Sequence, residues 1–155
     1  TKYKFKERNE AVEVTCPWGN RYDIHEPDPA AFGRMRLGIG YVELLVPKGK
    51  ADPIGRFYAE IMGARVEMIE RKGKPCAAVT AGEGQHLYYR EAAKVPEYEG
   101  DHIQIYINRF SAPYAGIKAK SRITSESSVH QLISRTSWTR TRARSSTPST
   151  TRSAA

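Results

Sequence analysis

The chain has 155 residues, of which 39 % are hydrophobic and 27 % charged, and this composition is typical of one globular domain with a real core. Its formal net charge is +8, but five arginines follow Gln131, where no acidic residue occurs, and the rest of the chain carries only about +3. Nucleic-acid-binding domains spread basic residues over a folded face and add aromatic platforms. We therefore expect no nucleic-acid partner.

The sequence contains neither a membrane-spanning pattern nor a signal peptide. No apolar run approaches the roughly 18 residues that a spanning helix needs. We expect a cytoplasmic protein with no membrane partner. Cys16 and Cys76 are the two cysteines, and no CxxC pair exists, which favours free thiols over a disulfide and argues against structural zinc.

The first predicted elements are two short strands. The runs "AVEVT" (11–15) and "RYDIH" (21–25) alternate apolar and polar residues, and the turn-forming run "CPWGN" lies between them. Together they predict a β-hairpin. The following segment, "EPDPAAFGRM" (26–35), contains two prolines and a glycine, and we expect it to be a connector.

Residues 40–91 are predicted to form a strand, a helix and three further strands. The first strand, "GYVELLVP", is stopped by a proline. Three runs follow the helix and are separated by turn residues. They are "ARVEMIER" (64–71), "CAAVTAG" (76–82) and "EGQHLYYRE" (83–91).

The helix of this unit, "DPIGRFYAEIMG" (52–63), has the strongest signals in the chain. Asp52 is a candidate cap, Pro53 fits the first helical turn, and Gly63 permits a left-handed C-terminal turn. The apolar residues fall on one face, which predicts packing on a sheet. They are Ile54, Phe57, Tyr58, Ile61 and Met62.

The same order begins again after the linker "AAKVPEYEG" (92–100). The run "DHIQIYI" (101–107) alternates as a strand does, and 108–122 predicts a weaker helix with Ser111 as a candidate cap. Two or three strands should then follow. The chain instead has "ITSESSVHQLIS" (123–134) and a tail rich in Arg, Ser and Thr.

This order of elements resembles the vicinal oxygen chelate superfamily, which includes glyoxalase I, extradiol dioxygenases and the bleomycin and fosfomycin resistance proteins. The matching pieces are "GYVELLVP", "IGRFYAEIMGARVE", "GQHLYYRE" and "GDHIQIYI", and the resemblance covers about residues 37–120. It implies an α+β fold in which paired βαβββ modules form a half-barrel mixed sheet with helices on the outer face.

The resemblance also implies a division of the chain. "VEVTCPWGNRYDIHEP" resembles the closing hairpin of such a module, so 1–36 would end a preceding module and add a linker. A full module would occupy 37–98 and the start of another 99–131. We expect a piece of a longer, tandem-module protein.

The tail, 132–155, differs from the acidic closing hairpin that the family would place there. Its Arg, Ser, Thr, Pro and Ala residues are those that dominate when GC-rich DNA is translated out of frame. With GC-rich codons, a frame offset by two bases turns "SRTSWTRT" into Ala-Asp-Ile-Val-Asp-Pro-Asp, which resembles the missing hairpin. A frameshift near Leu132 is therefore our hypothesis, and a low-complexity disordered tail is the alternative.

Metal-dependent members of the superfamily hold a divalent Fe, Mn, Ni, Co or Zn ion with His and Glu side chains from paired modules. The resemblance places candidate metal ligands at Tyr41, where the family often has His, at His86 and at His102. The last ligand would fall in the tail. If the N-terminal hairpin took that place, Asp23 would match, with His25 on the same face.

Glu43 lies two residues after Tyr41 on the same strand face, and it is our candidate catalytic base or a displaced ligand. The alternative is a surface carboxylate paired with arginine. Candidate residues of an aromatic small-molecule cleft are Tyr88, Tyr106 and Gln104.

Three functions remain open from the sequence. The first is a metal-dependent lyase, isomerase or dioxygenase of the glyoxalase type acting on a small molecule between modules. The second is a metal-free, drug-resistance-like binding protein. The third is a non-catalytic remnant. We expect a small-molecule ligand, and a homodimer or a module-swapped oligomer, because an unpaired sheet edge favours pairing between chains.

Overall fold

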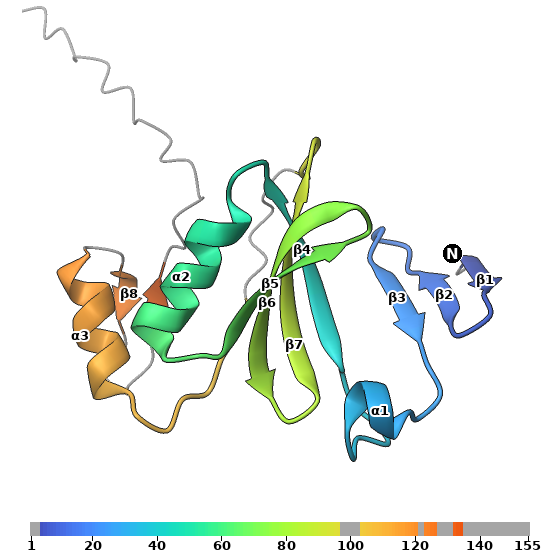
Figure 1. The fold of residues 1–155 in the computed structure, drawn as a ribbon, viewed down its shortest axis with the longest axis horizontal. Helices are drawn as coiled ribbons and strands as arrows, with labels where there is room; N and C mark the ends of the chain where they lie inside the picture. Colours follow the sequence, from blue (N-terminus) through green and yellow to red (C-terminus); the bar gives the residue numbers. More distant parts are fainter. Residues whose placement is uncertain (1–3, 97–102, 121–122, 127–131, 135–155) are drawn as a thin grey trace, which may run out of the picture.

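The computed structural model describes residues 4–96, 103–120, 123–126 and 132–134 of the chain. The fold is α+β, as predicted, and contains a mixed four-stranded sheet and a three-stranded antiparallel sheet (Figure 1). The four-stranded sheet comprises β4 (Tyr41–Pro47), β5 (Val66–Arg71), β6 (Lys74–Gly82) and β7 (Gln85–Ala92). The three-stranded sheet comprises β1 (Lys4–Glu7), β2 (Val12–Thr15) and β3 (Arg21–Ile24).

The four-stranded sheet and its helix confirm the strand-helix-strand-strand-strand order predicted for 40–91. The strands lie in the order β4-β7-β6-β5, in which β4 is parallel to β7 and the other pairs are antiparallel. A parallel pair needs a crossover, and α2 (Ala51–Met62) is part of it. Lys72 and Gly73 both have positive φ (53° and 68°), as a two-residue hairpin turn between β5 and β6 requires.

Helix α2 covers one face of this sheet and forms the core with it. Its predicted stripe is confirmed, because Ile54 and Tyr58 are buried and Phe57 and Met62 pack against the same cluster. Gly55 brings the helix close to the sheet, since an added Cβ would lie 3.0 Å from Val66 and 3.3 Å from Ala77.

The N-terminus of α2 is capped differently from the prediction. Lys50 is the N-cap residue, without a side-chain hydrogen bond, and Asp52 instead pairs with Arg56 at 3.0 Å. The buried carboxylate of Glu91, at the end of β7, accepts a hydrogen bond from the backbone N–H of Ala51 at 3.2 Å. Backbone hydrogen bonds, foremost that of Gly49, hold the pKa of Glu91 below its ordinary value. The cap thus comes from tertiary structure, whereas the predicted left-handed C-terminal Gly63 (φ 65°) is confirmed.

We expect Glu91→Ala to lower the free energy of unfolding by about 2 kcal/mol, because free N–H groups at the start of α2 lose their acceptor. Asp52→Ala is the matched control and should cost less than about 0.5 kcal/mol, since it removes only an exposed ion pair. Urea denaturation of both variants measures the difference. A larger loss of unfolding free energy for Asp52→Ala than for Glu91→Ala would show that Asp52 caps the helix, as predicted from the sequence.

The N-terminal sheet contains the predicted hairpin of β2 and β3, and β1 adds a strand that the sequence did not predict. The segment predicted as a connector contains α1 (Pro29–Phe32), where Asp28 accepts a hydrogen bond from the N–H of Ala30 at 2.8 Å. Figure 1 shows α2 on one side of the four-stranded sheet and the β1–β3 sheet on the other.

The second unit only partly follows the prediction. Helix α3 (Ser111–Ala119) forms, but Phe110, not Ser111, is its N-cap residue. Residues 103–107 are not in a strand, contrary to prediction, and residues 101–102 lie outside the described part of the chain. Strands β8 (Ile123–Glu126) and β9 (Leu132–Ser134) make a separate two-stranded sheet. The described residues therefore contain one complete βαβββ module, with an open sheet.

Two further predictions can be compared with this structure. Cys16 and Cys76 are both buried and free, as predicted. Residues 135–155 lie outside the described part of the chain, so the frameshift hypothesis stays a prediction. None of the described helices is both long and apolar enough to cross a bilayer.

Candidate functional site

The sheet face opposite α2 carries half of the predicted site residues, and we call it the inner face. Side chains alternate along a strand, so Leu44 and Val46 point to the α2 core while Tyr41 and Glu43 point away from it. Parallel pairing places Tyr41 opposite His86 and Glu43 opposite Tyr88. The inner face thus comprises Tyr41, Glu43, Arg71, His86, Tyr88 and Arg90.

Glu43 is the centre of an ion network on this face. One of its oxygens accepts a hydrogen bond from Nε of Arg71 at 2.8 Å, and the other accepts from Arg90 at 2.8–2.9 Å. Lys72 in the adjoining turn lies 3.3 Å from the carboxylate. The side chain of Glu43 is only 14 % exposed, so these contacts are partly shielded from solvent.

This network shows that the sheet is strongly curled. Strands β4 and β5 are its two edges, and in a flat sheet three strand spacings would separate them by about 14 Å. Arg71 at the end of β5 nevertheless reaches Glu43 of β4. The contact holds the two edges around the inner face and gives the half-barrel curvature that the sequence resemblance implied.

The charge state of Glu43 follows from these contacts. Burial raises its pKa, but the hydrogen bonds from Arg71 and Arg90 and the charge of Lys72 more than offset burial and lower the pKa to about 2. A carboxylate held by three cations at such a pKa is a poor base at neutral pH. The geometry therefore favours the ion-paired alternative for Glu43 over general-base catalysis.

Arg71 also lies between two tyrosine rings. Its guanidinium carbon is 4.9 Å from the ring centre of Tyr41 and 4.3 Å from that of Tyr88, within the range of cation–π attraction. Its Nε donates a hydrogen bond to Glu43 at 2.8 Å. The Arg71 side chain is 26 % exposed, so part of it is accessible to a ligand from solvent.

His86 and Asp23 each contact one of these tyrosines. The ring of His86 stacks in parallel on Tyr88, with 5.7 Å between ring centres. The hydroxyl of Tyr41 donates a hydrogen bond to Asp23 at 3.1 Å. Burial, and next the charge of Asp23, raise the pKa of the Tyr41 phenol above its ordinary value. Asp23 thus connects the N-terminal hairpin to the inner face.

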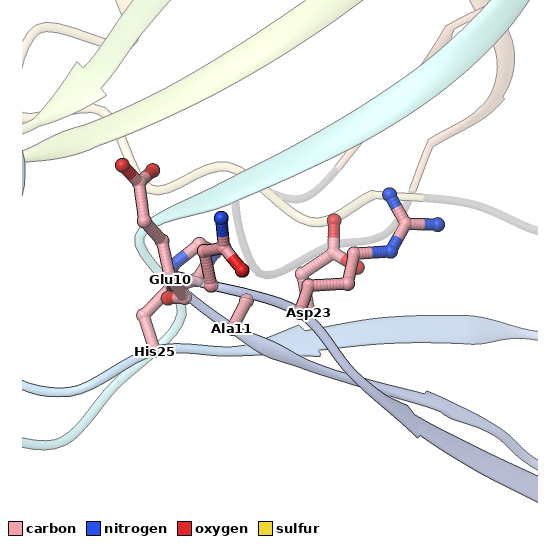
Figure 2. A pocket seen from close by; sticks show the side chains of 6 residues that line it. Glu10, Ala11, Asp23 and His25 are labelled. Atoms are coloured by element: carbon pink, nitrogen blue, oxygen red, sulfur yellow. Dashed lines mark hydrogen bonds between the residues drawn. The ribbon is translucent and has the colours of Figure 1, made fainter.

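A shallow, open hollow of about 540 Å³ adjoins this contact on the β1–β3 sheet. Figure 2 shows the carboxylates of Glu10 and Asp23 on the same side of that sheet, directed toward β4. His25 also lines the hollow, with its Nδ1 3.1 Å from the carbonyl oxygen of Glu10 and its ring 5.3 Å from that of Phe32.

The described residues form no complete metal site. Tyr41 and Asp23 bond each other, His86 stacks on Tyr88, and no three described His, Cys, Asp or Glu side chains are grouped to hold an ion. His102 lies outside the described part of the chain. The predicted metal centre therefore stays a prediction.

The predicted cleft residues differ in their surroundings. Tyr88 lies on the inner face, as described above, but Tyr106 is 87 % exposed and hydrogen-bonds Gln104 at 3.3 Å. An exposed ring forms no cleft wall, so this arrangement does not support placing Tyr106 and Gln104 beside Tyr88.

Sequence reasoning missed the basic members of the network, Arg71 and Arg90. Arg90 follows His86 and Tyr88 at two-residue spacing, and that alternation was the available signal. For Arg71 the sequence contains no such signal, because its contact with Glu43 depends on the curl of the sheet.

Comparisons of the chain with family models, curated proteins and solved structures return no match. The resemblance to the vicinal oxygen chelate superfamily therefore rests on the sequence pieces quoted above. The strand order β4-β7-β6-β5 with its crossover helix is the structural feature consistent with it.

Proposed function

We propose that this chain is a small-molecule-binding protein of the vicinal oxygen chelate type, with a ligand site on the inner face. The observation that carries the proposal is the position of Arg71. Its guanidinium is held by Glu43 and by two tyrosine rings, and the Arg71 side chain is still 26 % exposed. A fixed guanidinium loses little conformational entropy when it binds a carboxylate or phosphate.

The surrounding residues favour a planar anion. Three cations, Arg71, Lys72 and Arg90, share the single carboxylate of Glu43, and the Asp23 carboxylate beside Tyr41 offsets part of the remaining positive charge. The rings of Tyr88 and His86 offer stacking surface next to it. The ligand class that fits is an aromatic carboxylate, or a phosphate ester with an aromatic group.

The experiment is a calorimetric titration with benzoate, salicylate and 2-naphthoate, and with benzyl alcohol as the neutral analogue. We expect the three anions to bind and the alcohol not to bind. Arg71→Gln should weaken anion binding at least tenfold, because it removes the fork that pairs with a carboxylate. Arg65→Gln is the matched control, since Arg65 lies just before the same strand and, among the described residues, pairs with the exposed Glu67 alone.

Two outcomes would contradict the proposal. Equal binding of benzyl alcohol would show that no charge recognition takes place. Unchanged anion affinity in Arg71→Gln, with a melting temperature within a few degrees of the parent, would show that the ligand binds elsewhere.

A metal-dependent lyase, isomerase or dioxygenase is the second candidate function. It is favoured by the pairing of Tyr41 with His86, because these are the positions at which the resemblance places ligands from the first and fourth strands. Elemental analysis of the purified protein tests it. Less than about 0.1 equivalent of Fe, Mn, Ni, Co or Zn, with no gain after addition of each metal, would remove this candidate.

We retain a cytoplasmic location as part of the proposal. It is supported by the free thiols of Cys16 and Cys76, which suit a reducing compartment. A small-molecule ligand is the partner proposed for the inner face, with no nucleic acid or membrane involved.

A further inference from the structure

Tyr41 connects two side chains of opposite charge. The guanidinium of Arg71 lies over its ring, with 4.9 Å between the guanidinium carbon and the ring centre. Its hydroxyl donates a hydrogen bond to Oδ2 of Asp23 at 3.1 Å. A fixed cation and a fixed anion are therefore separated by little more than one phenol ring and its two contacts.

The position of Asp23 is fixed by the segment that follows its strand. That segment packs on the turn between β6 and β7, where a Cβ on Gly84 would clash with the backbone of Phe32. One residue further along, Gln85 donates a hydrogen bond to the carbonyl oxygen of Ile39 at 3.1 Å. Both contacts join the chain between β3 and β4 to the four-stranded sheet, so the Asp23 carboxylate is held beside the inner face.

The hollow next to Asp23 has a negatively charged lining. The carboxylates of Glu10 and Asp23 lie on the same side of the N-terminal sheet and are directed toward β4 (Figure 2). Arg8 also lines the hollow, but its guanidinium pairs with Glu13. With His25 neutral, two carboxylates remain to determine the charge that a ligand meets there.

The inner face has the opposite sign. Arg71, Lys72 and Arg90 share the single carboxylate of Glu43. A positive network on the four-stranded sheet and a negative hollow on the N-terminal sheet therefore meet at Tyr41. A molecule that contacts both surfaces needs an anionic group at one end and a cationic group at the other.

We propose that the ligand of the inner face is a zwitterion, an aromatic carboxylate that carries a protonated amine at the far end of its ring. This inference rests on the proposed function and adds a second point of recognition to it. The ligand carboxylate would pair with Arg71, and its ammonium group would pair with Asp23 and Glu10. The ligand would thus contact both sheets.

The chemistry of Asp23 favours an amine over a neutral group at that end. An ionised carboxylate has acceptors only, so it gains nothing from a methyl group placed beside it. An ammonium group donates charge-assisted hydrogen bonds, which are stronger than those between neutral groups. Since Tyr41 already holds Asp23 in place, little conformational entropy is lost when the amine binds.

The test is a calorimetric titration of the full chain with two ligands of the same shape, para-(aminomethyl)benzoate and para-methylbenzoate. We expect the zwitterion to bind at least about fivefold more tightly than the methyl analogue. In Asp23→Asn the ratio of the two affinities should fall to about one, because the amide keeps an acceptor for Tyr41 but has no charge. Glu60→Gln is the matched control. It removes the same charge from an exposed position on α2, across the sheet, and should leave the ratio unchanged.

Two outcomes would overturn this inference without touching the proposed function. One is equal affinity of the parent chain for the two ligands, while para-methylbenzoate binding still depends on Arg71. The other is a preference for the zwitterion that persists in Asp23→Asn, because the amine would then be recognised elsewhere. Affinities for both ligands that do not change in Arg71→Gln would instead contradict the proposed function itself.

Discussion

Glu43→Ala is expected to lower the free energy of unfolding by about 3–5 kcal/mol, as breaking a shielded ion pair does when one partner is removed. The guanidinium groups of Arg71 and Arg90 would remain close together on the inner face without their shared anion, with side chains only 26 % and 13 % exposed. The two edges of the sheet would also lose the contact that joins them across its curvature. Urea denaturation measures the loss.

Glu67→Ala is the matched control for Glu43→Ala. Glu67 lies on β5 and pairs with Arg65 at 2.8 Å, but both side chains are more than half exposed. An exposed pair contributes little, so this variant should lose less than about 1 kcal/mol. Equal losses in the two variants would show that the inner-face network does not hold the sheet together.

Acid should remove the same stabilisation without any substitution. The pKa of Glu43 is about 2 in the folded chain, below its ordinary value of 4.5. A carboxyl group with a depressed folded pKa stabilises the fold fully above its unfolded pKa, and this contribution is lost as pH falls from about 4.5 to 2. The difference corresponds to about 3 kcal/mol.

The pH dependence can be assigned by comparison with Glu43→Gln, which cannot titrate at this position. We expect urea midpoints of the parent chain to fall between pH 4.5 and 2 more steeply than those of Glu43→Gln. Parallel curves for the two proteins would assign the acid sensitivity to other carboxylates, among them Glu91, whose pKa is also lowered.

The predictable parts of this fold are those set by short-range sequence patterns. The apolar stripe of α2 and the alternation of β4 to β7 determined these elements locally, and they form as predicted. The cap of α2 was predicted wrongly because its acceptor, Glu91, is 40 residues from Ala51. Only the completed sheet brings that carboxylate to the helix.

Alternation alone also misled the prediction at 103–107. The pattern is that of a strand, yet a strand also needs a partner, and residues 103–107 pair with none of the described strands. Conversely, α1 was missed because a four-residue helix has no periodicity to detect.

The candidate site was predictable in its aromatic members and not in its electrostatics. Tyr41 and His86 were singled out by their positions on two strands that the family pairs, and Tyr88 as an aromatic residue of a cleft; the structure does place them together. Arg71 and Arg90 reach Glu43 across 28 and 47 residues of chain. Contacts over such separations follow from sheet order and curl, which no local pattern encodes.

The central claim is that Arg71 on the inner face recognises an anionic planar ligand. The most direct measurement is the NMR signal of its Nε–Hε group, identified by its loss in Arg71→Gln, during titration with benzoate and with benzyl alcohol. We predict a saturable shift with benzoate and none with benzyl alcohol. A signal that does not move when benzoate binds, or that moves equally with the alcohol, would contradict the claim.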